Sequence, residues 1–186
     1  MARPRRRKNK EYRTGQHLTA GEVERLIEAT SIHRDATMIL VCVPPWAQSG
    51  RAVDLRWDQV DFETGVLHVR RVKAGTPATH PLTGRELRAL RRQRRETGAA
   101  THLFMSERKA PISIDGYQKM VERVSVRARL GFQATSHMLR HACGFKLANE
   151  GVDTRTIQAY LGHKDIRHTV RYTELSLVRF KGLWRD

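Results

Sequence analysis

The sequence lacks the features that mark secreted, membrane-spanning and zinc-binding proteins. Only two of its 186 residues are cysteines, Cys42 and Cys143, which excludes a framework of several disulfides, and no CxxC pair is present. No uncharged apolar run approaches the roughly 18 residues that span a bilayer, and no apolar stretch follows the basic N-terminus as it does in a signal peptide. We therefore expect a reduced, cytoplasmic protein that does not enter a membrane.

Acidic residues are scarce beside basic ones: 19 Asp and Glu against 35 Lys and Arg give a formal net charge of +16. Hydrophobic residues make up 39% of the chain, which is enough for a core, and 186 residues suit one domain. Such a surplus of positive charge indicates a polyanionic partner, most simply nucleic acid.

The basic residues form two groups along the chain. Seven of the first 13 residues are basic, so we expect residues 1–16 to form a basic flexible arm, either a solubilising tail or a phosphate-binding segment, ahead of one domain over 17–186. The second group lies on a helix expected over 84–96 and consists of Arg88, Arg91, Arg92 and Arg95. This arginine stripe either faces solvent or contacts phosphates.

Hydrophobic periodicity predicts a mostly α-helical fold with a small β-hairpin. A capping box at Thr19–Glu22 marks the start of the first helix. Further helices are expected over residues 34–43, 84–96, 113–129, 136–149, 154–161 and 174–183, with a short helical stretch over 52–57 that ends near Trp57. A strand over 66–72, a turn at Gly75–Pro77 and a returning strand over 78–82 form the hairpin.

Residues suited to phosphate chemistry gather in the C-terminal third. On a helix over 136–149, His137, Arg140 and His141 share a face because they are three and four residues apart. Such a face is often structural, and the histidine pair lacks a nearby third ligand for zinc. The run Leu161-Gly-His163 follows the next helix, and nine residues later Tyr172 lies in a polar stretch.

The other tyrosines of the C-terminal two thirds, Tyr117 and Tyr160, have the apolar surroundings of core residues, which leaves Tyr172 for a role outside the core. A tyrosine hydroxyl can attack phosphorus and form a covalent phosphotyrosine. An arginine can bind two phosphate oxygens, and a histidine can act as a base or a hydrogen-bond donor. A set of this kind can cleave a phosphodiester without a metal or another cofactor.

The segment from Thr135 to Glu174 resembles the C-terminal signature of the tyrosine recombinases of the phage integrase family: H-x-x-R, then L-G-H, then a tyrosine nine residues on. The length and the run HMLRHACG particularly resemble the short fimbrial phase-switch recombinases, which have no separate N-terminal core-binding domain. The resemblance implies the mostly α-helical tyrosine-recombinase catalytic fold over 17–186. It also implies double-stranded DNA with inverted-repeat sites as partner, a homotetramer on synapsed DNA, no cofactor, and a cytoplasmic, nucleoid-associated location.

The same resemblance implies a role for each matching residue. Tyr172 is the expected nucleophile, Arg140 holds the scissile phosphate, and His137 and His163 flank it as base and hydrogen-bond donor. The catalytic lysine of the family lies on a β-hairpin, where this sequence has Lys73.

One segment departs from the family pattern. The family's first catalytic arginine precedes a stretch like Asp54-Leu-Arg-Trp57, and counting back without gaps places Gln48 in its column. One codon choice for residues 44–51, read one base later, encodes Arg-His-Gly-Leu-Arg-Ala-Gly-Glu, which is the family motif. Our hypothesis is that two compensating frameshifts produced this run, unless Arg51 replaces the missing arginine.

Two alternatives to an active recombinase follow from these observations. A catalytically impaired DNA-binding relic of the family would keep the motifs after residue 135 and lack the arginine at position 48. A basic RNA-binding protein would explain the charge of +16 but not the ordered motifs.

Overall fold

The computed structural model describes residues 17–42, 55–69 and 78–174. Seven α-helices account for most of them: α2 (Ala20–Glu28), α3 (His33–Cys42), α4 (Gly84–Thr97), α5 (Ile114–Arg127), α6 (Ser136–Asn149), α7 (Thr154–Leu161) and α8 (Arg167–Glu174). No helix in this part of the chain is long and apolar enough to cross a bilayer. The predicted class, mostly α with a small sheet, is confirmed, and the bounds of α6 and α7 agree with the sequence prediction.

The sheet has three short antiparallel strands in the order β1 (Val60–Asp61), β2 (Val66–Val69) and β3 (Ala78–Pro81). Val69 pairs with Ala78, so β2 and β3 are the two sides of the predicted hairpin. The two-residue strand β1 was not predicted, because so short a segment carries no alternating pattern. The turn of the hairpin, which includes Lys73, lies outside the described residues.

The prediction of a short helical stretch that ends near Trp57 is wrong for residues 55–57, the part of it that the structure describes. The amide of Trp57 donates to the carbonyl of Thr101 at 3.0 Å, and the amide of Leu103 donates to the carbonyl of Leu55 at 2.8 Å. These bonds use backbone groups that a helix would pair internally. A 3₁₀ turn, Trp57–Gln59, therefore begins where the helical stretch was expected to end.

Capping residues fix the ends of the helices near the site. The side chain of Asp153 accepts hydrogen bonds from the amides of Arg155 and Thr156 and so starts α7. Gly162 ends the same helix with a φ of 68°, in the left-handed region that glycine tolerates best. The glycine of the L-G-H run thus turns the chain at the end of α7 and places His163 directly after the turn.

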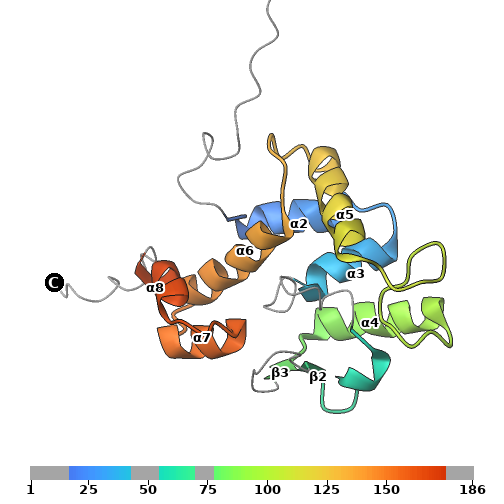
Figure 1. Ribbon diagram of the computed structural model, residues 1–186, viewed down its shortest axis with the longest axis horizontal. Helices are drawn as coiled ribbons and strands as arrows, with labels where there is room; N and C mark the ends of the chain where they lie inside the picture. Colours follow the sequence, from blue (N-terminus) through green and yellow to red (C-terminus); the bar gives the residue numbers. More distant parts are fainter. Residues whose placement is uncertain (1–16, 43–54, 70–77, 175–186) are drawn as a thin grey trace, which may run out of the picture.

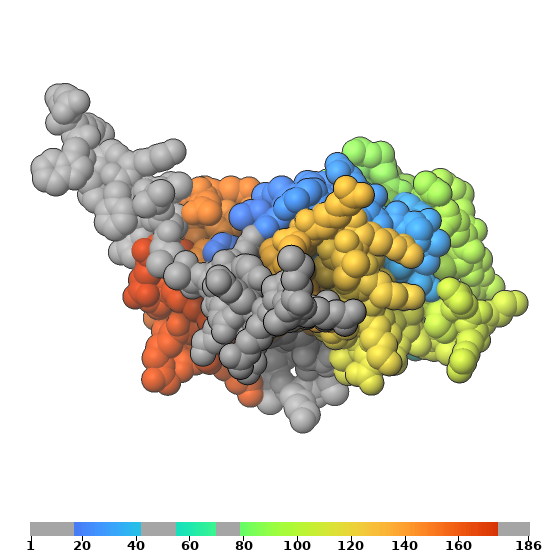
Figure 2. All heavy atoms as spheres, turned by 90° about the horizontal axis from the view of Figure 1, so that it is seen from above, coloured from blue at the N-terminus to red at the C-terminus, as the bar shows by residue number. Residues whose placement is uncertain are grey.

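The buried residues form two clusters that α6 connects. The larger cluster is built from α2, α3, α4, α5, the sheet and the first half of α6. The smaller one consists of Cys143, Ala148, Ile157, Leu161 and Tyr172, and lies between α6, α7 and α8. Figure 1 shows α6 running from the α2–α5 group to the α7–α8 group. The candidate site belongs to the smaller cluster, and Figure 2 shows this end of the molecule in red, opposite the green segment that includes α4.

Candidate active site

Tyr172 lies on a face of α8 that is attached to the rest of the domain at three points. Thr169, Tyr172 and Thr173 are spaced three and four residues apart, so they share this face. Thr169 Oγ1 lies 2.8 Å from His163 Nδ1, and Thr173 Oγ1 lies 3.0 Å from Thr154 Oγ1. The third point is Tyr172, whose hydroxyl lies 2.6 Å from Nδ1 of His141.

Tyr172 is fully buried, with an exposed fraction of 0%. The sequence placed it in a polar stretch outside the core, and this expectation is wrong. Residues 167–174 form a helix that was not predicted, because Val170 and Tyr172 are its only apolar residues. The aromatic ring leaves this polar segment and packs against Phe145, whose ring centroid is 5.0 Å away and nearly perpendicular.

His141 joins the nucleophile candidate to a second histidine. Its Nε2 lies 2.6 Å from Nε2 of His137, while its Nδ1 faces the hydroxyl of Tyr172. A neutral ring that accepts from the phenol at Nδ1 and donates at Nε2 satisfies both contacts. The two histidines therefore pair with each other rather than point their nitrogens at a common position for a metal ion. The sequence analysis placed His141 on the face of His137 and Arg140 but gave it no role, although the four-residue spacing was the available signal.

Arg140 and His163 approach this cluster from two elements. Arg140 is 7% exposed, and its Nη2 donates to the carbonyl of Leu161 at 2.9 Å. This bond ties the H-x-x-R motif on α6 to the start of the L-G-H motif at the end of α7. The ring of His163 lies 6.1 Å from that of Tyr172 and is nearly parallel to it. Four of the five predicted site residues thus lie in one cluster; the fifth, Lys73, lies outside the described residues, as do Gln48 and Arg51.

Arg171, the neighbour of Tyr172, adds a second cation to the cluster. Its Nη2 lies 2.8 Å from Nδ1 and 2.7 Å from Nε2 of His141, so the guanidinium lies against the imidazole ring rather than pointing at one nitrogen. Its Cζ is 5.3 Å from the centroid of the Tyr172 ring. The sequence analysis noted Arg171 only as a polar neighbour of the tyrosine.

Burial and positive charge keep the histidines of the site neutral. Burial, together with the charge of Arg171, lowers the pKa of His141 to about 3. Burial and the charge of Arg140 lower the pKa of His163 to about 4, and the pKa of His137 is also lowered, mainly by burial. Burial raises the pKa of Tyr172, although Arg171 opposes this shift. Neutral histidines can accept a proton or donate one hydrogen bond, and the phenol stays protonated at neutral pH.

These shifts predict that acid destabilises the fold. Below about pH 6.5 the unfolded chain takes up protons on His141 and His163, whereas the folded chain does not until its lower pKa values are reached. Stability should therefore be complete above about pH 6.5 and decrease as the pH falls. We expect the midpoint of thermal unfolding to fall by several degrees between about pH 7 and about pH 5. His141→Asn should make this decrease smaller; an equal decrease in the variant and the unchanged protein would contradict this origin.

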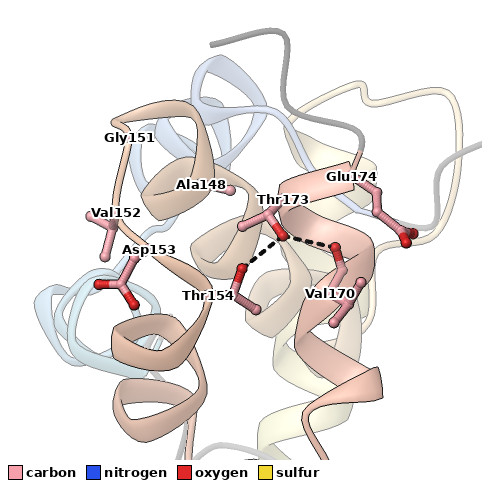
Figure 3. A pocket seen from close by; sticks show the side chains of 8 residues that line it. All are labelled: Ala148, Gly151, Val152, Asp153, Thr154, Val170, Thr173 and Glu174. Atoms are coloured by element: carbon pink, nitrogen blue, oxygen red, sulfur yellow. Dashed lines mark hydrogen bonds between the residues drawn. The ribbon is translucent and has the colours of Figure 1, made fainter. Parts of the chain in front are cut away.

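A cavity of about 530 Å³ lies beside the cluster, between the end of α6, the start of α7 and α8. Figure 3 shows Thr173 among the side chains that line it, with its hydroxyl hydrogen-bonded to Thr154 and to the carbonyl of Val170. Tyr172 is not among the residues that line this cavity. The threonine pair fixes the distance between α7 and α8 and thereby helps to set the position of Tyr172.

Comparison with known proteins identifies relatives that match most of the chain. The model of the Phage integrase family matches residues 16–177. The type 1 fimbriae regulatory proteins FimE and FimB of Escherichia coli strain K12 are both 36% identical to this chain; the matches cover 90% of it and 90% and 88% of the relatives. Tyrosine recombinase XerA of Pyrococcus furiosus is 29% identical over 88% of this chain and 59% of its own length.

Solved structures of recombinases have a similar fold. The crystal structure of XerA recombinase has a TM-score of 0.79 at 25% identity, over 89% of this chain and 62% of that chain. The recombinase XerH, bound to its difH substrate before cleavage, has the same fold, with a TM-score of 0.74 at 21% identity over 92% of this chain and 55% of that chain. This chain therefore belongs to the phage integrase family and is a tyrosine-type site-specific recombinase.

Proposed function

We propose that this protein cuts and rejoins duplex DNA through a covalent 3′-phosphotyrosine formed by Tyr172. The observation that supports the proposal is the cluster itself. His163 lies against the ring of a tyrosine that occupies the family's nucleophile position, His137 is linked to its hydroxyl through His141, and Arg140 is bonded to the end of α7 just before His163. The cluster supplies a nucleophile, a cation for the phosphate oxygens and neutral imidazoles, which are the groups that phosphoryl transfer to a hydroxyl requires.

In the proposed reaction the Tyr172 hydroxyl attacks the scissile phosphorus. The phenolic proton passes to the proposed base, the neutral His137. The bond between phosphorus and the 5′ oxygen breaks, and the leaving oxygen takes a proton to become a 5′-hydroxyl. Lys73 is the proposed donor of that proton. Arg140 binds the non-bridging oxygens, and His163 donates a hydrogen bond to them. The 5′-hydroxyl of the partner strand then reverses the step, so the energy of the original bond is kept in the phosphotyrosine.

The proposed partner is double-stranded DNA with inverted-repeat sites, on which four copies of the chain synapse two sites. The charge of +16 supports a DNA partner. Inverted repeats match the two-fold relation of paired subunits. A protein acting in this way on chromosomal DNA works in the cytoplasm, on the nucleoid, and residues 1–16 are proposed as an arm that reaches additional phosphates ahead of a catalytic domain over 17–186.

Binding should depend steeply on salt, because each phosphate neutralised by Lys or Arg releases counterions. Deleting residues 1–13, which carry seven basic residues, should make the dependence shallower while leaving the preferred site unchanged. A matched variant replaces the exposed Arg88, Arg91, Arg92 and Arg95 of α4 by Gln. A salt slope that is the same with and without the arm would show that the arm does not contact phosphate. If replacing the four arginines makes the salt dependence shallower, the stripe contacts phosphates; if the dependence is unchanged, the stripe faces solvent.

The experiment that tests the proposed function begins with fragments of genomic DNA retained by the protein. The selected site is synthesised with a nick near the cleavage position, so that the released fragment diffuses away and the covalent complex accumulates. Formation of a complex that survives denaturing electrophoresis supports the proposal. Retention of DNA without any covalent complex would instead favour the impaired, DNA-binding alternative.

A further inference from the structure

Thr169 lies on the buried face of α8, between the L-G-H run and Tyr172 in the sequence. Its exposed fraction is 0%, and its hydroxyl oxygen lies 2.8 Å from Nδ1 of His163, the histidine that follows the turn at the end of α7. Within the described residues this is the only hydrogen bond of the hydroxyl. Buried hydroxyls are nearly always bonded, so the contact with His163 satisfies a polar group that the core would otherwise exclude.

The direction of this hydrogen bond follows from where the hydroxyl hydrogen can go. A threonine in a helix commonly donates to a carbonyl of the preceding turn. The hydroxyls of Thr37, Thr97 and Thr173 do so, at 2.9, 2.9 and 3.0 Å. Thr169 has no such bond within the described residues. If Nδ1 of His163 donated to its oxygen, the hydroxyl hydrogen would therefore be buried without an acceptor, whereas a hydroxyl that donates to Nδ1 has its hydrogen satisfied.

An Nδ1 that accepts a hydrogen bond leaves the hydrogen of the ring on Nε2. Burial and the charge of Arg140 lower the pKa of His163 to about 4, so the imidazole is neutral at neutral pH and carries one hydrogen. Nε2 has no hydrogen-bond partner in the part of the chain that the structure describes, and His163 is only partly buried. The nitrogen that carries the hydrogen is thus open to a ligand.

We propose that Thr169 is a positioning residue for the reaction: its hydroxyl donates to Nδ1 of His163 and thereby keeps the ring hydrogen on Nε2, the nitrogen that donates to a non-bridging oxygen of the scissile phosphate. The inference rests on the proposed function, because it takes His163 as that donor. The opposite arrangement would present the lone pair of Nε2 to a negatively charged phosphate, and the two would repel each other.

The backbone of His163 is held by other contacts. Its amide donates to the carbonyl of Gln158, and the side-chain amide of Gln158 donates to the carbonyl of His163, both at 3.1 Å. Gly162 supplies the turn that precedes it. What Thr169 adds is control of the ring, both its rotation and the position of its hydrogen. Removal of the hydroxyl should therefore impair the donor and leave the fold intact.

The first test identifies the ring nitrogen of His163 that carries the hydrogen, in the protein without DNA. The histidines are labelled with a heavy nitrogen isotope, and correlations between the nitrogens and the carbon-bound ring hydrogens distinguish the two neutral forms of imidazole. The signals of His163 are assigned by their absence from His163→Leu. We expect the hydrogen on Nε2 at neutral pH, and a hydrogen on Nδ1 would overturn the inference.

The second test compares Thr169→Val with Thr169→Ser. Valine has the shape of threonine without the hydroxyl, whereas serine keeps the hydroxyl and loses the methyl group. Single-turnover formation of the covalent complex at saturating nicked DNA should slow about ten-fold or more in the valine variant, since partners that orient a histidine at a metal site contribute about 10–100-fold. The serine variant should stay within about three-fold of the unchanged protein. A valine variant as fast as the unchanged protein would refute the role of Thr169.

Thr37→Val is the matched control for the loss of a buried hydroxyl. Thr37 is also a buried helical threonine beside a histidine, with its hydroxyl 3.1 Å from Nε2 of His33, but it lies on α3 and outside the cluster around Tyr172. The change should lower the midpoint of thermal unfolding slightly and leave the rate unaltered. An equal slowing in Thr37→Val and Thr169→Val would attribute the effect to any buried hydroxyl and overturn the inference.

A double-mutant cycle tests whether Thr169 acts through His163. In a His163→Leu background, Thr169→Val should slow the reaction little further, because the ring on which the hydroxyl acts is absent. A full additional loss would place the effect of Thr169 elsewhere and contradict the proposed role.

The outcomes also separate this inference from the proposed function. If the unchanged protein forms no covalent complex through Tyr172, the proposed function fails and the inference fails with it. If the complex forms and requires His163 but is insensitive to Thr169→Val, the positioning role is wrong and the proposed function stands.

Discussion

Tyr172→Phe should abolish covalent attachment of the protein to nicked substrate DNA while leaving DNA binding intact. The change removes only the hydroxyl oxygen, so the phosphorus has no nucleophile, and the covalent yield should fall to the background of the assay. The ring still fills its place beside Gly144 and Phe145. The variant should lose about 1 kcal/mol of stability, because the hydrogen bond between the hydroxyl and Nδ1 of His141 is lost. Denaturing electrophoresis of the reaction with end-labelled DNA measures the yield.

Tyr160→Phe is the matched control for this experiment. Tyr160 is partly buried beside the smaller core cluster, and its ring stands edge-on to His80 with the centroids 4.9 Å apart. Its loss should change stability slightly and leave the covalent yield unaltered. A normal yield with Tyr172→Phe, or a lost yield with Tyr160→Phe, would show that the nucleophile has been misassigned.

The sequence predicted most helices near the site because their signals are local. The capping box at Thr19 and Glu22 is present, and α6 and α7 have the predicted bounds. The helix α8 was missed for the opposite reason: its eight residues contain only two apolar side chains, and contacts with α6 and α7 hold it in place. Propensity and periodicity do not report such tertiary contacts.

In the candidate site, too, local motifs were predictable from the sequence and tertiary contacts were not. The motifs predicted His137, Arg140, His163 and Tyr172 as site residues, since each is fixed by its spacing from the others. The role of His141 depends on the contact of its ring with the hydroxyl of a residue 31 positions away. The burial of Tyr172 depends on the missing side chain of Gly144. Neither a pairwise distance nor a close approach is encoded in a local pattern, so only the folded structure could reveal them.

The segment 44–51 decides whether the chain is an active enzyme or an impaired one, and it lies outside the described residues. It follows α3, which ends at Cys42. Pro44 and Pro45 cannot continue a helix with its normal hydrogen bonds, because proline lacks the amide hydrogen. Gln48, in the column of the family's first catalytic arginine, is neutral and cannot make the charged two-pronged contact of a guanidinium with a phosphate. As written, the protein should bind DNA, because the basic surface and the cluster around Tyr172 do not depend on this segment, but it should cleave DNA slowly.

Replacing residues 44–51 by Arg-His-Gly-Leu-Arg-Ala-Gly-Glu should therefore increase the rate of cleavage by roughly 10² or more. One donor that binds the transition state contributes about 10²–10³ in rate, and an arginine acting on a phosphoryl group contributes about 10³–10⁵. The replacement should also raise the midpoint of thermal unfolding, because it removes two prolines, which cannot continue a helix, from the segment that follows α3. The decisive measurement is single-turnover formation of the covalent complex at saturating DNA, which excludes differences in affinity.

Two single substitutions identify the group responsible. Gln48→Arg restores the guanidinium alone, and a partial gain in rate would show that the charge at this position matters apart from the rest of the segment. Arg51→Gln in the unreplaced chain tests whether Arg51, three residues after position 48, already acts as the clamp. If the rate falls with Arg51→Gln and is unchanged by the eight-residue replacement, Arg51 fills the role and the frameshift has no consequence for the mechanism. If the replacement accelerates cleavage and Arg51→Gln has no effect, the chain as written is a damaged recombinase whose remaining site residues are intact.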